Sequence, residues 1–159
     1  MVDNQRKQFP LTVMDIMDKD ERVIVLLGDI GVFAFQDVFK KYPKRIYNVG
    51  ILEQSMVGMA AGLAMAGFIP IVHTIEPFLV DRAYEQIKDD FGYQELKGTI
   101  VGVDVSKTAP NLGYTHQCPY ALEHMSHIKG MNVFEPKTSE EFDILLKQSY
   151  EGLNYFRIS

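Results

Sequence analysis

Three side chains that suit proton transfer or ring stacking follow strand-like segments of the sequence. Glu53 opens an apolar helix, Phe78 lies at the start of the next helix, and His116 lies in a long loop. A carboxylate and an imidazole can both move protons, and an aromatic ring can stack on a planar ligand. Each residue also has a purely structural explanation, because carboxylates favour helix starts, a phenylalanine there usually belongs to the core, and a lone loop histidine usually has no function. The residue types alone leave both explanations open.

Strand-like and helical segments alternate along the chain. We expect strands at residues 22–28, 45–49, 68–75, 99–105, 131–134 and 155–158. We expect helices at residues 11–19, 36–42, 53–66, 78–91, 120–128 and 138–150, the last of them opened by a capping box of Thr138 and Glu141. This alternation predicts an α/β fold of three layers, with a mostly parallel sheet and helices on both faces. Binding sites in such sheets lie at the carboxyl ends of the strands, where loops such as 106–119 begin.

Composition excludes several classes of function. The chain has 159 residues, enough for one domain, and a formal net charge of -5, which argues against nucleic-acid binding. Its single cysteine, Cys118, excludes an internal disulfide and indicates a reducing compartment, so we expect a cytoplasmic protein without a secretory signal. Residues 55–75 carry no charged side chain, but Gly67 and Pro70 interrupt this run. We therefore expect a buried helix and a buried strand there, and no membrane span.

Four sequence blocks occur in a characteristic order and together cover nearly the whole chain. The first reads NVGILEQSMVGMAAGLAMAG at residues 48–67, with Pro70 three residues further on. The others are PFLVDRAYEQIKDD at 77–90, GYTHQ at 113–117 and MNVFEP at 131–136, before a closing NYFRIS. Together they resemble the pyrimidine-binding domain of the transketolase and 1-deoxyxylulose-5-phosphate synthase family of thiamine-diphosphate enzymes. The resemblance implies one such domain over residues 1–159.

The resemblance also implies roles for individual residues. Glu53, in the Gly-Ile-x-Glu motif with Ile51, is the glutamate that hydrogen-bonds N1′ of the cofactor's aminopyrimidine and so starts the catalytic cycle. The Phe78 ring packs against the aminopyrimidine. For Arg82 and Tyr84, further along the same helix, two explanations stay open: both point into the site and Arg82 binds the cofactor, or they are a surface arginine and a core tyrosine. His116, in the Thr-His-Gln loop, contacts substrate oxygens. Small residues on the helix after Glu53 lie near a subunit interface in the family, and here these are Gly58, Ala61, Gly62 and Ala66.

One position departs from the family pattern. Members usually have Asp-Gly-x-Thr-His-Gln, whose aspartate binds a sugar hydroxyl, whereas this chain has Leu112 there. A leucine cannot accept a hydrogen bond, although Asn111 is close enough in sequence to substitute if the loop shifts. The usual sugar-phosphate substrate is therefore in doubt. The sequence GDIGVF at residues 28–33 is also slightly similar to that of the dehydrogenase branch of the family.

The diphosphate-binding and C-terminal domains of complete family members are expected to be absent from this chain. The Gly-Asp-Gly motif that holds Mg²⁺ and the diphosphate is missing, since Gly28-Asp29 is followed by Ile30. We therefore assign no metal ligand and expect a partner subunit to hold Mg²⁺ and much of the thiamine diphosphate, in a homodimer or a heterotetramer. The expected activity is transfer of a two-carbon ketol unit. The alternatives are a 2-oxo-acid decarboxylating or dehydrogenase-type subunit, or a non-catalytic pseudo-subunit.

Overall fold

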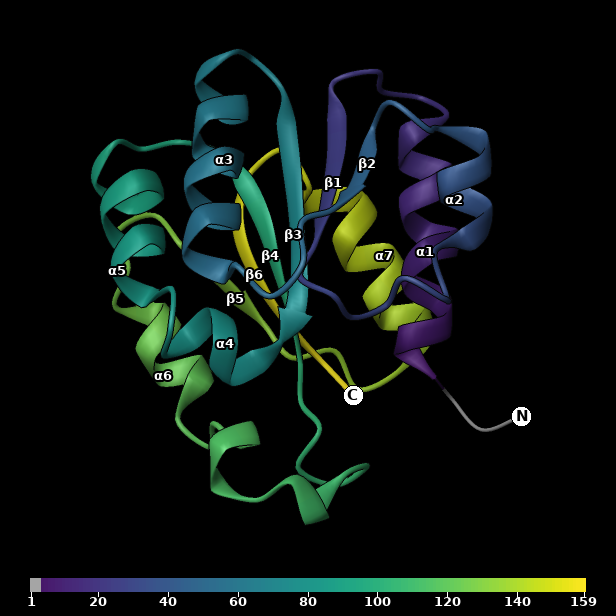
Figure 1. The fold of residues 1–159 in the computed structure, drawn as a ribbon. Helices are drawn as coiled ribbons and strands as arrows, with labels where there is room; N and C mark the ends of the chain where they lie inside the picture. Colours follow the sequence, from purple (N-terminus) through teal and green to yellow (C-terminus); the bar gives the residue numbers. More distant parts are fainter. Residues whose placement is uncertain (1–3) are drawn as a thin grey trace.

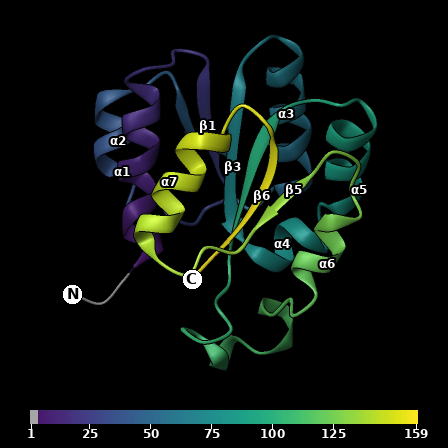
Figure 2. The same ribbon diagram turned by 180° about the vertical axis from the view of Figure 1, so that it is seen from behind.

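Six parallel strands form one sheet with helices on both of its faces (Figures 1 and 2). The computed structural model describes residues 4–159. The sheet order is β2-β1-β3-β4-β6-β5, and every neighbouring pair is parallel. The strands are β1 (Val23–Leu27), β2 (Ile46–Asn48), β3 (Ile69–Ile75), β4 (Gly98–Val103), β5 (Asn132–Phe134) and β6 (Leu153–Ile158). The predicted three-layer α/β fold is confirmed.

Two apolar cores lie on opposite faces of the sheet, which explains why the central strand β1 is apolar at every position. In β1, Val23, Val25 and Leu27 face one core, whereas Ile24 and Leu26 face the other. The first core is covered by α1 (Gln5–Met17), α2 (Gln36–Lys41) and α7 (Ser139–Ser149). The second is covered by α3 (Glu53–Met65), α4 (Glu76–Val80), α5 (Tyr84–Gln86), a π-helical segment (Ile87–Tyr93) and α6 (Ala121–Ser126).

The first helix begins earlier than the sequence predicts. We expected a helix over residues 11–19, but α1 spans Gln5–Met17 and contains Pro10. The helix starts at Asn4, whose side-chain Oδ1 accepts a hydrogen bond from the backbone N–H of Lys7 (3.0 Å). An asparagine at this position satisfies one of the otherwise unpaired amides of the first turn, and that stabilises a start ahead of the proline.

The helix expected over residues 78–91 is divided into three parts. Regular helix ends at Val80, resumes at Tyr84–Gln86 and continues as the π-helical segment Ile87–Tyr93. Close packing of this segment on the residues that follow α6 leaves no room at Gly92, where a Cβ atom would lie 2.6 Å from Ile128 Cγ2. The expected loop at 106–119 is also partly ordered into two 3₁₀ turns, Pro110–Leu112 and Tyr114–His116.

The uncharged run at residues 55–75 forms most of α3 and strand β3. Strand β3 is almost fully buried, as predicted, whereas α3 is buried on one side only and exposes Gly58, Met59, Gly62 and Met65. Within residues 4–159, no helix combines the length and the apolar character that crossing a membrane requires.

The first helix is fastened to segments from the other end of the sequence. Gln5 Nε2 donates to the carbonyl oxygen of Pro136 (2.6 Å), and the Ser159 amide donates to Gln5 Oε1 (2.8 Å). The backbone N–H of Asn4 donates to Ser139 Oγ (3.1 Å). The Phe9 ring meets the Phe142 ring edge-on, with centroids 5.5 Å apart. Helices α1 and α7 therefore pack as a pair on one face of the sheet (Figure 1).

A neutral histidine is buried in the first core. His73 on β3 is 3% exposed, and its Nδ1–H donates to the Val101 carbonyl (3.0 Å). Phe9 and Phe35 flank the ring at centroid distances of 5.0 and 6.3 Å. Burial lowers the pKa of His73 from 6.5 to about 4. The unfolded chain therefore binds a proton at this residue before the folded chain does.

We expect His73 to destabilise the fold in mild acid. As the pH falls from about 6.5 to about 4, protonation of the unfolded state should remove about 3 kcal/mol from the free energy of unfolding. Urea unfolding at pH 7 and pH 4.5 measures this loss. Carboxylates also titrate in this pH range, so two variants serve for comparison. The loss of unfolding free energy between pH 7 and pH 4.5 should be smaller in His73→Val and unchanged in the exposed control His127→Gln. Equal losses in all three proteins would contradict the assignment.

Candidate functional site

Glu53 lies at the carboxyl end of β2, in the first turn of α3. The connecting loop turns at Gly50, whose φ of 77° favours glycine. Asn48 Oδ1 fixes the loop by accepting hydrogen bonds from the backbone amides of Gly50 (3.2 Å) and Asp29 (3.0 Å). Glu53 is 1% exposed, and Arg82 Nη1 donates to its Oε2 (2.7 Å). Its Oε1 is buried and has no hydrogen-bond partner among residues 4–159.

The other predicted polar and aromatic residues form one cluster with Glu53. The Arg82 guanidinium lies over the Phe78 ring, 4.2 Å from its centroid. The His116 ring meets the Phe78 ring edge-on, with centroids 5.1 Å apart, and His116 Nδ1 lies 3.0 Å from Thr115 Oγ1. These residues follow β2, β3 and β4, whose carboxyl ends share one edge of the sheet. The parallel sheet thus brings together residues far apart in sequence.

A pocket of about 420 Å³ adjoins this cluster. Its lining residues are Pro77, Phe78, Asp81, Arg82, Tyr114, Thr115, Gln117 and Tyr120. Sequence reasoning missed Asp81, Tyr114 and Tyr120 as part of this surface. Asp81 follows Phe78 by three residues and Tyr114 immediately precedes Thr115, so proximity in sequence was the only available signal. The pocket presents carboxylate, guanidinium, amide and hydroxyl groups together with the aromatic rings of Phe78, Tyr114 and Tyr120.

Ile51 and Leu112 are not among the residues that line the 420 Å³ pocket. Ile51 is 65% exposed beside Leu52, and Leu112 is 43% exposed in the loop after β4. Tyr84 faces elsewhere, because its hydroxyl donates to the His124 carbonyl (3.2 Å). Of the site residues predicted from the sequence, Glu53, Phe78, Arg82 and His116 are therefore brought together, and Ile51 lies at the edge.

The small residues of α3 divide between two environments. Ala61 is 4% exposed and packs in the second core, so it is not part of an open surface stripe. Gly58, Gly62 and Ala66 are exposed. The large apolar side chains of Met59 and Met65 are exposed on the same helix, at 45% and 67%. A surface of glycine, alanine and methionine therefore remains open on α3.

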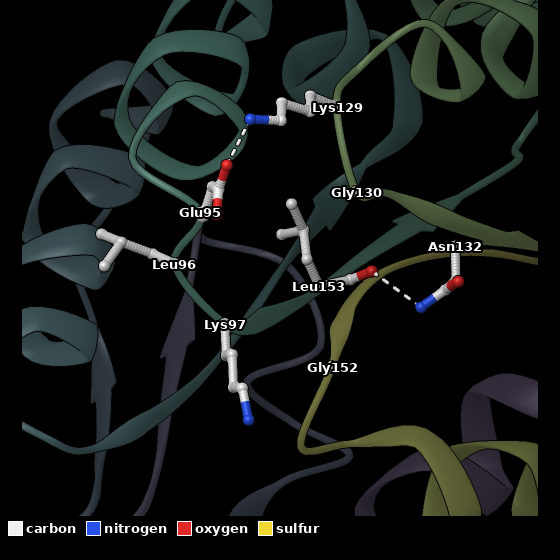
Figure 3. A pocket seen from close by; sticks show the side chains of 8 residues that line it. All are labelled: Glu95, Leu96, Lys97, Lys129, Gly130, Asn132, Gly152 and Leu153. Carbon is white, nitrogen blue, oxygen red and sulfur yellow. Dashed lines mark hydrogen bonds and ion pairs between the residues drawn. The ribbon is translucent and has the colours of Figure 1, made fainter.

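A second pocket lies at the opposite edge of the sheet, beside the amino ends of β4, β5 and β6 (Figure 3). It has a volume of about 480 Å³, and Leu96 and Leu153 are among the residues that line it. Lys129 pairs with Glu95, and Asn132 Nδ2 donates to the Leu153 carbonyl (3.3 Å), so these polar side chains are already satisfied within the chain. This pocket does not contain any residue of the Glu53 cluster. Among residues 4–159, no group of three His, Cys, Asp or Glu side chains is placed to hold a metal ion.

Comparison with known proteins agrees with the fold and the sequence blocks. The 1-deoxy-D-xylulose-5-phosphate synthase of Lachnoclostridium phytofermentans is 42% identical over 117 residues, which cover 74% of this chain and 18% of that protein. The 6-deoxy-6-sulfo-D-fructose transketolase subunit of Clostridium sp. strain MSTE9 is 32% identical over 149 residues, which cover 92% of this chain and 46% of that subunit. This chain thus spans half or less of the length of the curated relatives that it matches.

A solved structure gives the same result. A split gene transketolase, described as an inactive beta4 tetramer, superimposes with a TM-score of 0.86 at 27% identity, covering 97% of this chain and 50% of that one. The family model for the pyrimidine-binding domain of transketolase matches residues 4–158. The chain therefore belongs to the transketolase pyrimidine-binding domain family.

Proposed function

We propose that this chain is the pyrimidine-domain subunit of a split, transketolase-like thiamine-diphosphate enzyme that transfers a two-carbon ketol unit. The observation that carries the proposal is the half-paired carboxylate of Glu53. Arg82 holds Oε2, whereas Oε1 is buried without a partner among the described residues. A buried polar atom of this kind is destabilising unless another group satisfies it. N1′ of the aminopyrimidine is a matching group, so Glu53 fits the cofactor that its sequence motif implies.

Thiamine diphosphate, when bound, supplies the carbanion chemistry that side chains lack. The part played by this chain is to bind, orient and exchange a proton. With the cofactor bound, Glu53 Oε1 would hydrogen-bond N1′, and Arg82 holds the carboxylate in one orientation through Oε2. Phe78 would offer its ring to the aminopyrimidine. Because Glu53 is 1% exposed, bulk water would be kept from this hydrogen bond.

His116 is proposed to handle the substrate. Its ring contacts the Phe78 ring, and its neighbours Thr115 and Gln117 line the 420 Å³ pocket. An imidazole gives and takes protons near neutral pH, which suits contacts to substrate hydroxyl and carbonyl oxygens. Arg82 contacts both Glu53 and the Phe78 ring, and Arg82 and Phe78 line the pocket, so cofactor and substrate would meet at these two side chains.

A partner subunit is proposed to hold the diphosphate and Mg²⁺, and the chain itself to be a single pyrimidine-binding domain. Support comes from one relative that is named as a subunit and from one solved neighbour that is a split gene transketolase. The exposed surface of Gly58, Gly62, Met59 and Met65 on α3 offers an apolar face for assembly. We propose a homodimer or a heterotetramer built partly on this face.

Leu112 favours a second candidate function. Leu112 stands where an aspartate would bind a sugar hydroxyl, and its side chain is 43% exposed in the loop that carries His116. An apolar group there suits a less hydroxylated substrate, as in a 2-oxo-acid decarboxylating or dehydrogenase-type enzyme. A non-catalytic pseudo-subunit is the least favoured, because it would give no reason to keep a buried, half-paired Glu53 next to His116.

We expect the isolated chain to bind thiamine diphosphate weakly. The chain provides groups for the pyrimidine half of the cofactor, whereas the diphosphate and Mg²⁺ are assigned to a partner. Calorimetry with thiamine diphosphate and Mg²⁺ should therefore show weak binding by the chain alone and tight binding after co-purification with a diphosphate-domain protein. A neighbouring gene encoding a protein of about 250–300 residues is the first candidate for that partner. Tight Mg²⁺-dependent binding by the chain alone would contradict the proposed division of the site.

A further inference from the structure

A buried ionic cluster links the start of α4 to the last strand, and the proposed proton transfer does not use it. Its centre is Glu76, the first residue of α4, which is 1% exposed. Glu76 Oε1 accepts a hydrogen bond from the Tyr155 hydroxyl (2.6 Å) and lies 3.1 Å from Arg157 Nε. The Arg157 contact is close but not aligned as a hydrogen bond, so Arg157 Nε and Glu76 Oε2 both lack hydrogen-bond partners within residues 4–159. The contact between Glu76 and Arg157 is therefore an ion pair and not an aligned hydrogen bond.

Arg157 forms ion pairs with three carboxylates in this cluster. Arg157 lies within ion-pair distance of Glu76, of Asp104 after β4 (3.0 Å) and of Glu135 after β5 (3.6 Å). Burial raises the pKa of Glu76 to about 7, Asp104 and Glu135 act in the same direction, and Tyr155 and Arg157 oppose them. The remaining neighbours are Cys118, whose pKa burial raises to about 12, and Asp81, which is 3.8 Å from the Cys118 thiol. Glu76 is thus the member of the cluster that can change charge near neutral pH.

Glu76 lies where a change in its charge would shift the start of α4 relative to the sheet. A Cβ atom on Gly102 of β4 would lie 2.9 Å from the Tyr155 hydroxyl and 3.2 Å from Glu76 Cα. The first turn of α4 therefore rests directly on the sheet, without intervening space. Phe78 is two residues after Glu76, in the same helix, and its ring supports Arg82. A small displacement of Glu76 relative to β6 would move Phe78 and Arg82 relative to Glu53.

We propose that Glu76 is a positioning residue, whose ion pair with Arg157 sets the place of α4 and hence of Phe78 and Arg82. Gain of a proton by Glu76 loosens the pair and releases Arg157 towards Asp104 and Glu135. The importance of this positioning for catalysis rests on the proposed function. The coupling between the charge of Glu76 and the position of Phe78, however, is a property of this chain alone. It can be measured without cofactor or partner.

The test is an NMR titration of the full chain between pH 5.5 and 8.5, following the ¹³C carboxyl signal of Glu76 and the ring signals of Phe78. We expect both to change with one midpoint near pH 7. Glu76→Gln should remove this component from the Phe78 titration, whereas Glu85→Gln, an exposed carboxylate on α5, should keep it. His116 is present in both variants, so its own effect on Phe78 cancels in the comparison.

Variants of the partners test the direction of the effect. Arg157→Met should raise the Glu76 midpoint by roughly one pH unit or more, because it removes a cation within about 4 Å, and Arg157→Lys should restore part of the difference. Tyr155→Phe should also raise the Glu76 midpoint. If Glu76→Gln does not fold, this variant tests the link between Glu76 and Phe78 in its place, because the Phe78 midpoint should rise with that of Glu76. The inference is wrong if the Phe78 ring signals show the same pH dependence in Glu76→Gln and Glu85→Gln. It is also wrong if the Glu76 midpoint is unchanged in the Arg157 and Tyr155 variants. Neither result would bear on Glu53, whose role is tested by cofactor activation.

Discussion

Replacing Glu53 with glutamine should reduce the activity of the assembled enzyme by about 10²- to 10⁴-fold, the usual effect of removing a positioned proton-transfer group. Glutamine has the same size and can still accept from Arg82, but it cannot exchange a proton at the Oε1 position. Folding should be nearly unaffected, with a change of about 1 kcal/mol or less, because Arg82 is 42% exposed and water can solvate it when the ion pair is lost. The loss of activity should therefore come from the missing proton-transfer group and not from unfolding.

The decisive measurement is the exchange rate of the C2 proton of bound thiamine diphosphate, followed by NMR in the assembled complex. Glu53→Gln should slow this exchange, whereas Glu123→Gln, an exposed carboxylate on α6, should leave it unchanged. His116→Ala is the second comparison, because it should impair substrate turnover more than C2 exchange. If Glu53→Gln exchanges the proton as fast as the unaltered protein, Glu53 is only a helix-start carboxylate and the proposed mechanism is wrong.

Replacing Gly62 with leucine should abolish or strongly weaken assembly while leaving the isolated chain folded. The sequence alone does not decide between a folding defect and an assembly defect. The structure does, because a Cβ atom at Gly62 would meet nothing within 4 Å. Leucine also has a higher helix propensity than glycine, so the isolated chain should gain about 0.5–1 kcal/mol of stability. A side chain that fits the monomer but projects from the open face of α3 should obstruct only a partner surface.

Sedimentation of the protein alone and of its complex measures this effect, and thermal unfolding measures the stability. Gly62→Ala is the matched control, since it adds the same helix propensity with only one methyl group and should keep most of the assembly. The proposed contact surface is wrong if the leucine variant assembles like the alanine variant. A leucine variant that fails to fold would instead contradict the open environment of Gly62.

The sequence predicts the layers of this fold well, because its signals are local and repeated. The VIVLL run of β1 is apolar at every position, as a strand covered on both faces must be. The Thr138 half of the predicted capping box before α7 also forms, with Thr138 Oγ1 accepting from the Glu141 amide (3.0 Å), while the Glu141 carboxylate accepts from the Lys137 amide (2.6 Å). The start of α1 was wrong because Pro10 was a stronger signal than Asn4. The division of residues 78–91 was missed because no glycine or proline lies within this stretch to mark a break.

The candidate site could be predicted only in part. Glu53, Phe78 and His116 stand in recognisable motifs, and each follows a strand, so a parallel sheet brings them together. Their contacts could not be predicted, because the Arg82 bridge from Glu53 to Phe78 depends on how α4 ends and turns. Glu76 carried a weak signal as an acidic residue directly after a buried strand. Its partners Tyr155 and Arg157 come from the last strand, and nothing in the sequence connects them to it.

The attachment of α1 to the last part of the chain has a consequence for folding during synthesis. A ribosome releases Gln5 and Phe9 long before Pro136, Phe142 and Ser159, the residues that they contact. Until those residues emerge, the apolar side of α1 lacks the helix that covers it, and the nascent chain exposes a phenylalanine surface. Contacts that join such distant segments form late and slowly, so the partly made chain should need protection from aggregation until its last strand is complete.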